Sequence, residues 1–342
     1  MTLDSGAMDR GILYLPGSAV LRAMPPIAER IALAERALTA LVMDAEMPPK
    51  IGVHPRPDGS FAHAMPAMLR PSRDGATSAD DLLGMKWVAG FPGDTAAGLP
   101  PINALVIVND PATGLPTAIL DGGLITAQRT AAVSGVAVSR WAPHVAGRRP
   151  RATIVGAGVQ GHSHVEMLAH VLPGVDLTVH DRHQERAAAL VEVAASLRGI
   201  GTATAATGSA AEAIRTADVV ITAITFARPE DRQQMTPDWL APDALVVAVD
   251  YAALCSAATA RDAALFLTDD RGQFLANRDQ GQFDGYPDPT ATIGEAIING
   301  TSRARSGRVV AVPLGIGLAD IVFAAEIVAR ARVAGLGTVL PR

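Results

Sequence analysis

The sequence predicts an α/β protein of two domains, one with a doubly wound parallel sheet and one with an antiparallel α+β core that is closed by the C-terminal helix. Its 342 residues are more than usually fold around a single hydrophobic core. Strand and helix patterns alternate after residue 151, which predicts the parallel sheet. Before residue 122 short strands follow one another through turns, which predicts antiparallel pairing. We expect residues 1–128 with 313–342 to form the antiparallel domain and residues 129–312 the parallel one.

Composition and charge exclude several classes of protein. A net charge of −5 with three Trp and three Tyr does not suit a nucleic-acid-binding surface. Cys255 is the only cysteine, so no intrachain disulfide can form. The first residues contain acids where a signal peptide needs an apolar core, and no apolar run approaches the ~18 residues of a membrane span. We therefore expect a cytoplasmic protein that binds neither nucleic acid nor a membrane.

Three segments outside the alternating strand and helix pattern bear on function. Leu82–Gly90 predicts a strand with a single lysine, Lys86, among apolar neighbours. Thr126–Trp141 predicts a helix of small residues that is capped by Thr126 and bridges the two domains. Ile321–Ala334 predicts a final helix with the apolar spacing to pack back on the first domain.

The most informative motif lies between two predicted strands. Ala152–Val155 is a short apolar run, and the pattern G-x-G-x-x-G follows it over Gly156–Gly161. A helical pattern comes next, and a second strand ends on Asp181, twenty residues past the last glycine. This order is typical of a Rossmann-type domain, in which the glycines admit a dinucleotide pyrophosphate and the acid binds the adenosine ribose. The residues expected to bind the cofactor here are Gly156, Gly158, Val159, Gln160, Gly161 and Asp181.

The next strands extend this cofactor site. Val219–Ala223 predicts a buried strand, and a doubly wound sheet binds its ligands beyond the carboxyl ends of its strands. The residues expected to contact the cofactor there are Thr222, Ala223 and Thr225. Asp181 favours NAD, because a carboxylate repels the 2′-phosphate of NADP. Arg182 follows directly and could pair with that phosphate, so NADP stays possible.

Hydride chemistry also needs groups that hold a polar or anionic substrate. Lysine is rare in this chain, and the two lysines are Lys50 and Lys86. A lysine within an apolar strand predicts a cation aimed into a cleft, with a pKa that burial shifts toward proton transfer. Arg129, near the start of the bridging helix, suits a carboxylate. The eight histidines show no metal-binding spacing, so we expect no metal site and surface or capping roles for them, with the exception of His54, which lies beside Lys50.

Four sequence blocks resemble the ornithine cyclodeaminase/μ-crystallin superfamily, and the resemblance covers nearly the whole chain. The blocks are Lys86–Pro92 (KWVAGFP), Thr113–Pro116 (TGLP), Thr126–Ala132 (TAQRTAA) and Val155–Gly161 (VGAGVQG). A closing Gly315-x-Gly317-x-x-Asp320 is similar to the C-terminal motif of that family.

The resemblance implies a homodimer whose first domain provides the dimer contacts and the substrate site, with NAD(H) or NADP(H) bound in a cleft between the domains. Lys86 and Arg129 resemble the family's ligands for the substrate carboxylate, and Lys50 stands where the family usually has an arginine. Met65 resembles a residue that lines the substrate pocket, and Thr130 resembles a phosphate contact.

Two positions depart from the family pattern. The lysine at position 50 lacks the paired donors with which an arginine binds a carboxylate. Cyclodeaminases carry an aspartate after the fifth strand of the cofactor domain, whereas the aligned residue here is Ala252 and the nearest acid is Asp250. Either Asp250 replaces that aspartate or the chemistry differs.

These residues and the resemblance favour an NAD(P)-dependent oxidoreductase that reduces a cyclic or open imino acid to an amino acid, or runs the reverse. The catalytic candidates that would handle the proton are Lys86, Asp250 and Asp320. Two alternatives stay open. One is ornithine cyclodeaminase, a lyase that releases ammonia with bound NAD, and the other is a crystallin-like protein that holds NADP(H) with little turnover.

Overall fold

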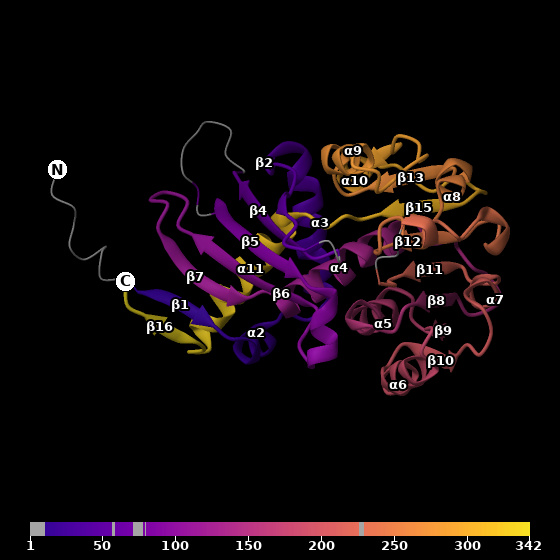
Figure 1. The fold of residues 1–342 in the computed structure, drawn as a ribbon, viewed down its shortest axis with the longest axis horizontal. Coiled ribbons are helices and arrows are strands. Elements are labelled where there is room, and N and C mark those ends of the chain that lie inside the picture. The colour runs from indigo at the N-terminus through magenta and orange to yellow at the C-terminus, as the bar shows by residue number, and fades with distance from the viewer. Residues whose placement is uncertain (1–10, 57–58, 71–77, 79, 226–228) are drawn as a thin grey trace. The chain divides into compact units, whose positions relative to one another are not determined.

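The computed structural model describes residues 11–56, 59–70, 78, 80–225 and 229–342. The chain divides into two compact units (Figure 1). Unit 1 contains Met1–Arg129 and Ile316–Arg342, and unit 2 contains Thr130–Gly315. Unit 1 is therefore discontinuous in sequence. Within the described residues, no helix is long and apolar enough to cross a membrane.

A mixed sheet forms the centre of unit 1. Its strands are β1 (Ile12–Leu15), β2 (Ala45–Glu46), β3 (Ile51–Val53), β4 (Phe61–Leu69), β5 (Leu82–Gly90), β6 (Ile102–Asn109), β7 (Pro116–Asp121) and β16 (Thr338–Leu340). They lie in the order β16-β1-β7-β6-β5-β4-β2, with β3 paired to β4. The pairs from β4 to β7 are antiparallel, as the sequence predicts. The exception is β1, which pairs parallel to β7.

Helices cover one face of this sheet. They are α2 (Gly17–Ala23), α3 (Ile27–Met43) and α11 (Gly317–Val333), and a short 3-10 turn spans Pro92–Ala97. α11 contacts β4, β5 and β6 as well as α2 and α3, and it is the yellow helix behind these strands in Figure 1. It begins at Gly317, earlier than the predicted start at Ile321. Asp320 therefore lies in its first turn rather than before it.

The opposite face of the unit 1 sheet carries exposed apolar side chains. Ile51, Ala64, Trp87 and Leu105 form one register row across β3, β4, β5 and β6. Ile51 is 64% exposed, Leu105 44% and Trp87 43% in the isolated chain. Because side chains alternate along a strand, Trp87 points to this outer face and its neighbour Lys86 points to the helix-covered face.

A parallel sheet forms the centre of unit 2, which confirms the predicted Rossmann-type fold. Its strands are β8 (Arg151–Val155), β9 (Val175–His180), β10 (Ile200–Ala205), β11 (Val219–Thr222), β12 (Leu245–Ala248), β13 (Leu265–Thr268), β14 (Ala291–Thr292) and β15 (Val309–Val312). Their order is β10-β9-β8-β11-β12-β15-β13-β14, so the winding reverses between β8 and β11. The central strands are buried on both faces, which explains why their sequences are unbroken apolar runs.

Short helices connect the strands of unit 2. They are α5 (Val159–Val171), α6 (Gln184–Ala195), α7 (Ala210–Ile214), α8 (Ala257–Asp262), α9 (Arg271–Asp279) and α10 (Ile293–Ile298), with 3-10 turns at Pro229–Asp231 and Pro237–Trp239. Two of them, α7 and α10, begin with a complete capping box, in which a Ser or Thr and a Glu exchange hydrogen bonds. Local sequence therefore sets where these helices begin.

The helix α4 (Gly123–Trp141) passes through the boundary between the units, which falls after Arg129. The predicted start at Thr126 is wrong, because the helix begins at Gly123. The Asp121 carboxylate accepts a hydrogen bond from the Gly123 N–H at 2.9 Å and supports this earlier start. Thr126 therefore lies inside the helix instead of capping it.

Candidate functional site

Lys86 lies in the middle of β5, on the sheet face that α11 covers. Met65 of β4 and Val106 of β6 flank it in register. Its side chain is 1% exposed, and its Nζ lies 2.7 Å from Oδ2 of Asp320 and 3.5 Å from the Thr126 hydroxyl. The apolar strand thus places a cation deep inside unit 1, beside a carboxylate.

Asp320 reaches Lys86 because α11 begins very close to β4. A Cβ at Gly317 would lie only 2.7 Å from the carbonyl oxygen of Met65, so this approach requires glycine. Asp320 follows within the first helical turn, where the positive end of the helix dipole favours a carboxylate. It is fully buried, and it accepts a hydrogen bond from Arg129 Nε at 3.1 Å.

Lys86, Arg129 and Asp320 form what we call the buried ion cluster. Its two cations share one carboxylate, so the cluster is positive when Lys86 is protonated. Burial, followed by the charge of Arg129, lowers the pKa of Lys86 to about 7, while Asp320 acts in the opposite direction. Arg129 contacts Asp320 through Nε, and within the described residues its two terminal nitrogens have no hydrogen-bond partner. A positive site with an open guanidinium fork is suited to a carboxylate ligand.

Three further residues surround this cluster in unit 1. Lys50 lies just before β3, and its charge lowers the pKa of both Lys86 and His63. Met65 is buried beside Lys86. His63 lies two residues before Met65 and therefore on the same face of β4. His63 was predicted only to have a surface or capping role, although its alternation with Met65 along β4 is a signal that could have indicated a role in the site.

The glycine turn of unit 2 connects β8 to α5 and depends on two close approaches. Gly156 has φ of +109°, and a Cβ there would lie 2.3 Å from the Ala223 carbonyl oxygen. A Cβ at Gly161 would lie 2.3 Å from the carbonyl oxygen of Gly156. A Cβ at Gly158 would instead meet open space, and both Gly158 and Val159 are exposed.

The helix α5 begins at Val159, and its N-cap residue is Gly158, which has no side chain with which to cap it. The first N–H groups of a helix have no partner within the helix, and the dipole makes this end positive. Together with the open side of Gly158, this end fits the pyrophosphate of a dinucleotide, and Gln160 lies in the same first turn. The residues present thus fit the cofactor that the motif implies.

Asp181 ties the end of β9 to the glycine turn. Its carboxylate accepts hydrogen bonds from the N–H groups of Ala157 and His183, each at 2.8 Å. A carboxylate can accept further hydrogen bonds, so ribose hydroxyls still find acceptors there. Arg182 is exposed, and its Nε donates to the His183 ring at 3.2 Å.

Asp250 is buried beyond the carboxyl end of β12. It accepts hydrogen bonds from the Thr222 hydroxyl at 2.7 Å and from the Ile224 N–H at 3.1 Å. Burial raises the pKa of Asp250 to about 7, although these hydrogen bonds act in the opposite direction. Thr222 is fully buried, Ala223 is partly buried and Thr225 is exposed. Asp250 therefore orders the segment from which cofactor contacts are expected.

Buried hydrogen bonds connect α4 to the start of α5. His164 is fully buried, so the predicted surface or capping role is wrong for this histidine. Its Nδ1 lies 2.7 Å from the Gln160 carbonyl oxygen, and its Nε2 lies 2.8 Å from the Ser134 hydroxyl. That hydroxyl also lies 3.2 Å from the carbonyl oxygen of Thr130, itself buried. Burial lowers the pKa of His164 to about 4, so a neutral ring makes this connection.

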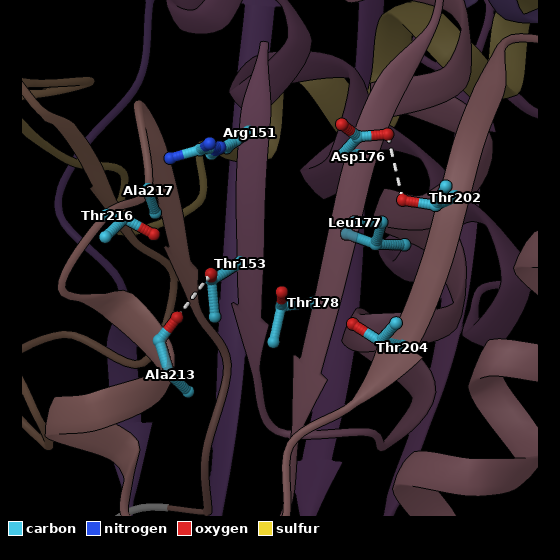
Figure 2. A pocket seen from close by; sticks show the side chains of 10 residues that line it. All are labelled: Arg151, Thr153, Asp176, Leu177, Thr178, Thr202, Thr204, Ala213, Thr216 and Ala217. Atoms are coloured by element: carbon cyan, nitrogen blue, oxygen red, sulfur yellow. Dashed lines mark hydrogen bonds between the residues drawn. The ribbon is translucent and has the colours of Figure 1, made fainter. Parts of the chain in front are cut away.

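A separate hollow of about 200 Å³ lies on the unit 2 sheet beside α7 (Figure 2). Thr153, Thr178 and Thr204 form a register row across β8, β9 and β10 at its floor. Arg151 and Asp176 lie at the amino ends of their strands, whereas ligands of doubly wound sheets bind beyond the carboxyl ends. We therefore give the hollow no part in the candidate site. Among the described residues, no three His, Cys, Asp or Glu side chains gather as metal ligands would.

Known proteins match the chain over most of its length. The family model for the ornithine cyclodeaminase/mu-crystallin family matches residues 20–327. The nodulation efficiency protein NfeD of Rhizobium meliloti is 35% identical over 301 residues, which cover 86% of this chain and 87% of that protein. The ketimine reductase mu-crystallin of Mus musculus is 31% identical over 173 residues, which cover 51% of each protein.

Solved structures share the fold. The Δ(1)-pyrroline-2-carboxylate reductase of Thermococcus litoralis, in complex with NADH and L-proline, has a TM-score of 0.81 and 25% identity, covering 96% of this chain and 100% of that one. An archaeal alanine dehydrogenase dimer with bound NAD has a TM-score of 0.80 and 24% identity, covering 96% of this chain and 98% of that one. The fold of this chain is therefore one that solved nicotinamide-binding proteins also have.

Proposed function

The chain belongs to the ornithine cyclodeaminase/mu-crystallin family, and from this premise we propose that it is an NAD(P)H-dependent reductase that acts on the C=N bond of an imino acid. The observation that carries this proposal is the buried ion cluster, which offers two cations and an open guanidinium fork to a carboxylate. A relative named as a ketimine reductase and a solved reductase that binds NADH and L-proline support this reaction class.

Each member of the buried ion cluster has a distinct role in this proposal. Arg129 and Lys86 bind the substrate carboxylate, and their charge draws electron density from the neighbouring imine carbon. Asp320 positions both cations, since its Oδ2 contacts Lys86 and its Oδ1 contacts Arg129. The ammonium of Lys86 can release a proton to the substrate nitrogen near neutral pH, because its pKa is about 7. A bound nicotinamide supplies the hydride.

Asp250 has a different role in this proposal. Its carboxylate is already engaged by Thr222 and Ile224, which lie in the segment expected to contact the cofactor. We therefore assign Asp250 to the support of this segment rather than to proton transfer. The residues that would hold the cofactor are Thr130, Gly156, Gly158, Val159, Gln160, Gly161, Asp181, Thr222, Ala223 and Thr225.

NAD is the proposed cofactor, since the Asp181 carboxylate repels a 2′-phosphate. We expect Asp181→Ser to lower the ratio of NADH to NADPH efficiency by roughly tenfold or more, the contribution of one charge-assisted hydrogen bond. Arg182→Ser is the matched variant, and it should reduce the use of NADPH alone. Steady-state kinetics with both cofactors measure these ratios. An unchanged ratio in Asp181→Ser would rule out this role for the carboxylate.

A screen of imines tests the reaction itself. The purified protein is mixed with NADH or NADPH and with Δ(1)-pyrroline-2-carboxylate, Δ(1)-piperideine-2-carboxylate, or an α-keto acid plus ammonia or methylamine. Loss of the absorbance of the reduced nicotinamide with at least one of these imines is the expected result. Ammonia release from L-ornithine with no net change in that absorbance would identify a cyclodeaminase instead. Tight NADPH binding without turnover of any of these compounds would identify a crystallin-like binding protein.

The protein also acts as a homodimer in this proposal. The outer row of Ile51, Ala64, Trp87 and Leu105 is a contiguous apolar surface on unit 1, and such surfaces on soluble proteins mark contacts between proteins. A second copy of the chain offers the same surface, so the pairing would be symmetric and closed. The archaeal alanine dehydrogenase of the same fold is itself described as a dimer.

A further inference from the structure

His63 is the diagonal neighbour of Lys86 across β4 and β5. His63 pairs with Val88 in register, and Met65 pairs with Lys86. The side chains of His63, Met65 and Lys86 therefore lie on the same face of the sheet. The ring of His63 is half-buried, unlike the fully buried ion cluster beside it. It therefore lies between Lys86 on β5 and the short strand β3.

Two neighbours fix the imidazole of His63 in place. The Phe61 ring stacks on it with centroids 4.5 Å apart and an interplanar angle of 26°. On β3, the directly opposite residue is Gly52, where a Cβ would lie 2.7 Å from Cδ2 and 3.0 Å from Nε2 of the ring. Glycine weakens a strand, so a glycine at this position is explained by the space that the ring occupies. The ring is thus held in a set orientation before any ligand binds.

The fixed ring has no hydrogen-bond partner within the described residues, although a half-buried imidazole has a donor and an acceptor to satisfy. Burial, and then the charges of Lys50, His54 and Lys86, lower the pKa of His63 to about 4. At neutral pH the ring is therefore neutral and presents one N–H donor. The side chains whose charges act on it are all basic, and two of them are the lysines Lys50 and Lys86, so its surroundings favour an anion over a cation.

We infer that His63 binds the substrate side chain and that the substrate is an imino acid whose side chain ends in a carboxylate. The α-carboxylate occupies the buried ion cluster, and the His63 N–H donates to an oxygen of the second carboxylate. An ammonium side chain would be repelled by Lys50, whose charge also acts on the His63 ring, so basic imino acids are disfavoured. An alkyl side chain would leave the ring without an acceptor. This inference rests on the proposed function, since it names the substrate class of that same site.

A pair of α-keto acids of equal chain length tests the inference. With ammonia, 2-oxoglutarate forms an imine with a terminal carboxylate, and 2-oxopentanoate forms one with a terminal methyl group. We expect wild type to prefer the 2-oxoglutarate imine. His63→Leu should lower kcat/KM for that imine roughly 10- to 100-fold, mainly through KM, as loss of a hydrogen bond to a charged group does. Efficiency with the 2-oxopentanoate imine should change by less than about twofold.

Two further variants separate recognition from folding. His63→Gln retains an N–H donor and should recover part of the preference for 2-oxoglutarate. Gly52→Ala keeps the imidazole but displaces it, so it should lower that preference in a protein that circular dichroism shows to be folded. Equal losses with both keto acids in His63→Leu, or no loss with either, would overturn the inference.

A measurement of keto acid binding tests the role of His63 without requiring turnover. If wild type reduces neither imine, the proposed function is put in doubt, and titration calorimetry of the full-length protein with 2-oxoglutarate and 2-oxopentanoate then decides about His63. Tighter binding of 2-oxoglutarate that is lost in His63→Leu supports the inference. Equal binding of the two keto acids by wild type, or a preference that His63→Leu retains, refutes it.

Discussion

A single buried carboxylate balances two cations in unit 1, so Asp320 should matter to stability more than any surface charge. Lys86 and Arg129 are both buried beside it. Removing one member of a buried ion pair costs about 3–5 kcal/mol, because the remaining charge stays desolvated. We predict that Asp320→Asn lowers the free energy of unfolding by about that amount. Urea unfolding followed by circular dichroism measures it.

Arg330 supplies the control on the same helix. It is partly exposed and pairs with Glu29 and Glu326. Exposed ion pairs contribute about 0–1 kcal/mol, so Arg330→Gln should change the free energy of unfolding by no more than that. Similar losses in the two variants would show that the buried ion cluster does not hold α11 in place.

Asp250 makes stability depend on pH in a direction that can be measured. Burial raises its pKa from 3.8 to about 7, so the folded protein keeps a proton that the unfolded chain loses. The stability that this proton contributes is fully present below the unfolded pKa and is lost as the pH rises to about 7. Asp250→Asn resembles the protonated acid and lacks this loss. Across that pH range, wild type should therefore become less stable relative to Asp250→Asn. A difference between the urea midpoints of wild type and Asp250→Asn that stays constant at every pH would contradict a buried, protonated carboxyl group at Asp250.

At the scale of the element, the glycine turn before α5 allows folding and cofactor binding to be separated. A Cβ at Gly161 would collide with the Gly156 backbone, so Gly161→Ala should destabilise the protein by roughly 1–3 kcal/mol and weaken NADH binding. A Cβ at Gly158 meets no protein atom, so Gly158→Ala should leave the melting temperature unchanged. It should still raise the Kd for NADH, because the methyl group occupies the approach of the pyrophosphate.

Thermal unfolding measures the melting temperatures of the two glycine variants, and a fluorescence titration measures their Kd for NADH. NADH binding by Gly158→Ala that matches wild type would show that no dinucleotide approaches the turn. A melting temperature of Gly161→Ala that matches wild type would show that α5 can shift away from β8 without cost.

Elements with strong local signals were predicted from sequence, and those that depend on distant pairing were not. The predicted strand at Val219–Ala223 is β11, which is one residue shorter, and the predicted run at Ala152–Val155 is β8 extended by one residue. Buried parallel strands are unbroken apolar runs, so they can be recognised without knowledge of their partners. β1 and β16 pair with each other from opposite ends of the chain, and no local pattern indicates that pairing.

The candidate site shows the same limit. Lys86 stood out because one lysine interrupts an apolar run, which is a local signal. Its partner Asp320 depends on how α11 docks through Gly317 onto Met65, which is a tertiary contact. His63 was missed because its importance comes from Phe61 and Gly52, and Gly52 lies on another strand.

At the scale of the whole molecule, the outer face of the unit 1 sheet predicts the state of assembly. Trp87→Lys places a charge in the middle of the apolar row, and burying that charge against a second copy is costly. We expect wild type to sediment as a dimer and Trp87→Lys to sediment as a monomer at micromolar concentration. Val193→Lys on α6 is the matched control, since Val193 and Trp87 are both 43% exposed. A monomeric wild type, or a dimer that survives Trp87→Lys, would contradict this interface.

The discontinuity of unit 1 has a consequence for the order in which the protein is made. Unit 2 is one continuous segment, so its core can close as soon as Gly315 has left the ribosome. Unit 1 has then had its strands available for longer, but it still lacks α11 and β16. Until α11 has been made, Lys86 lacks the Asp320 carboxylate, and only α2 and α3 are available to cover the inner sheet face. The buried ion cluster of unit 1 can therefore form only after α11 has been made, whereas unit 2 does not depend on that segment.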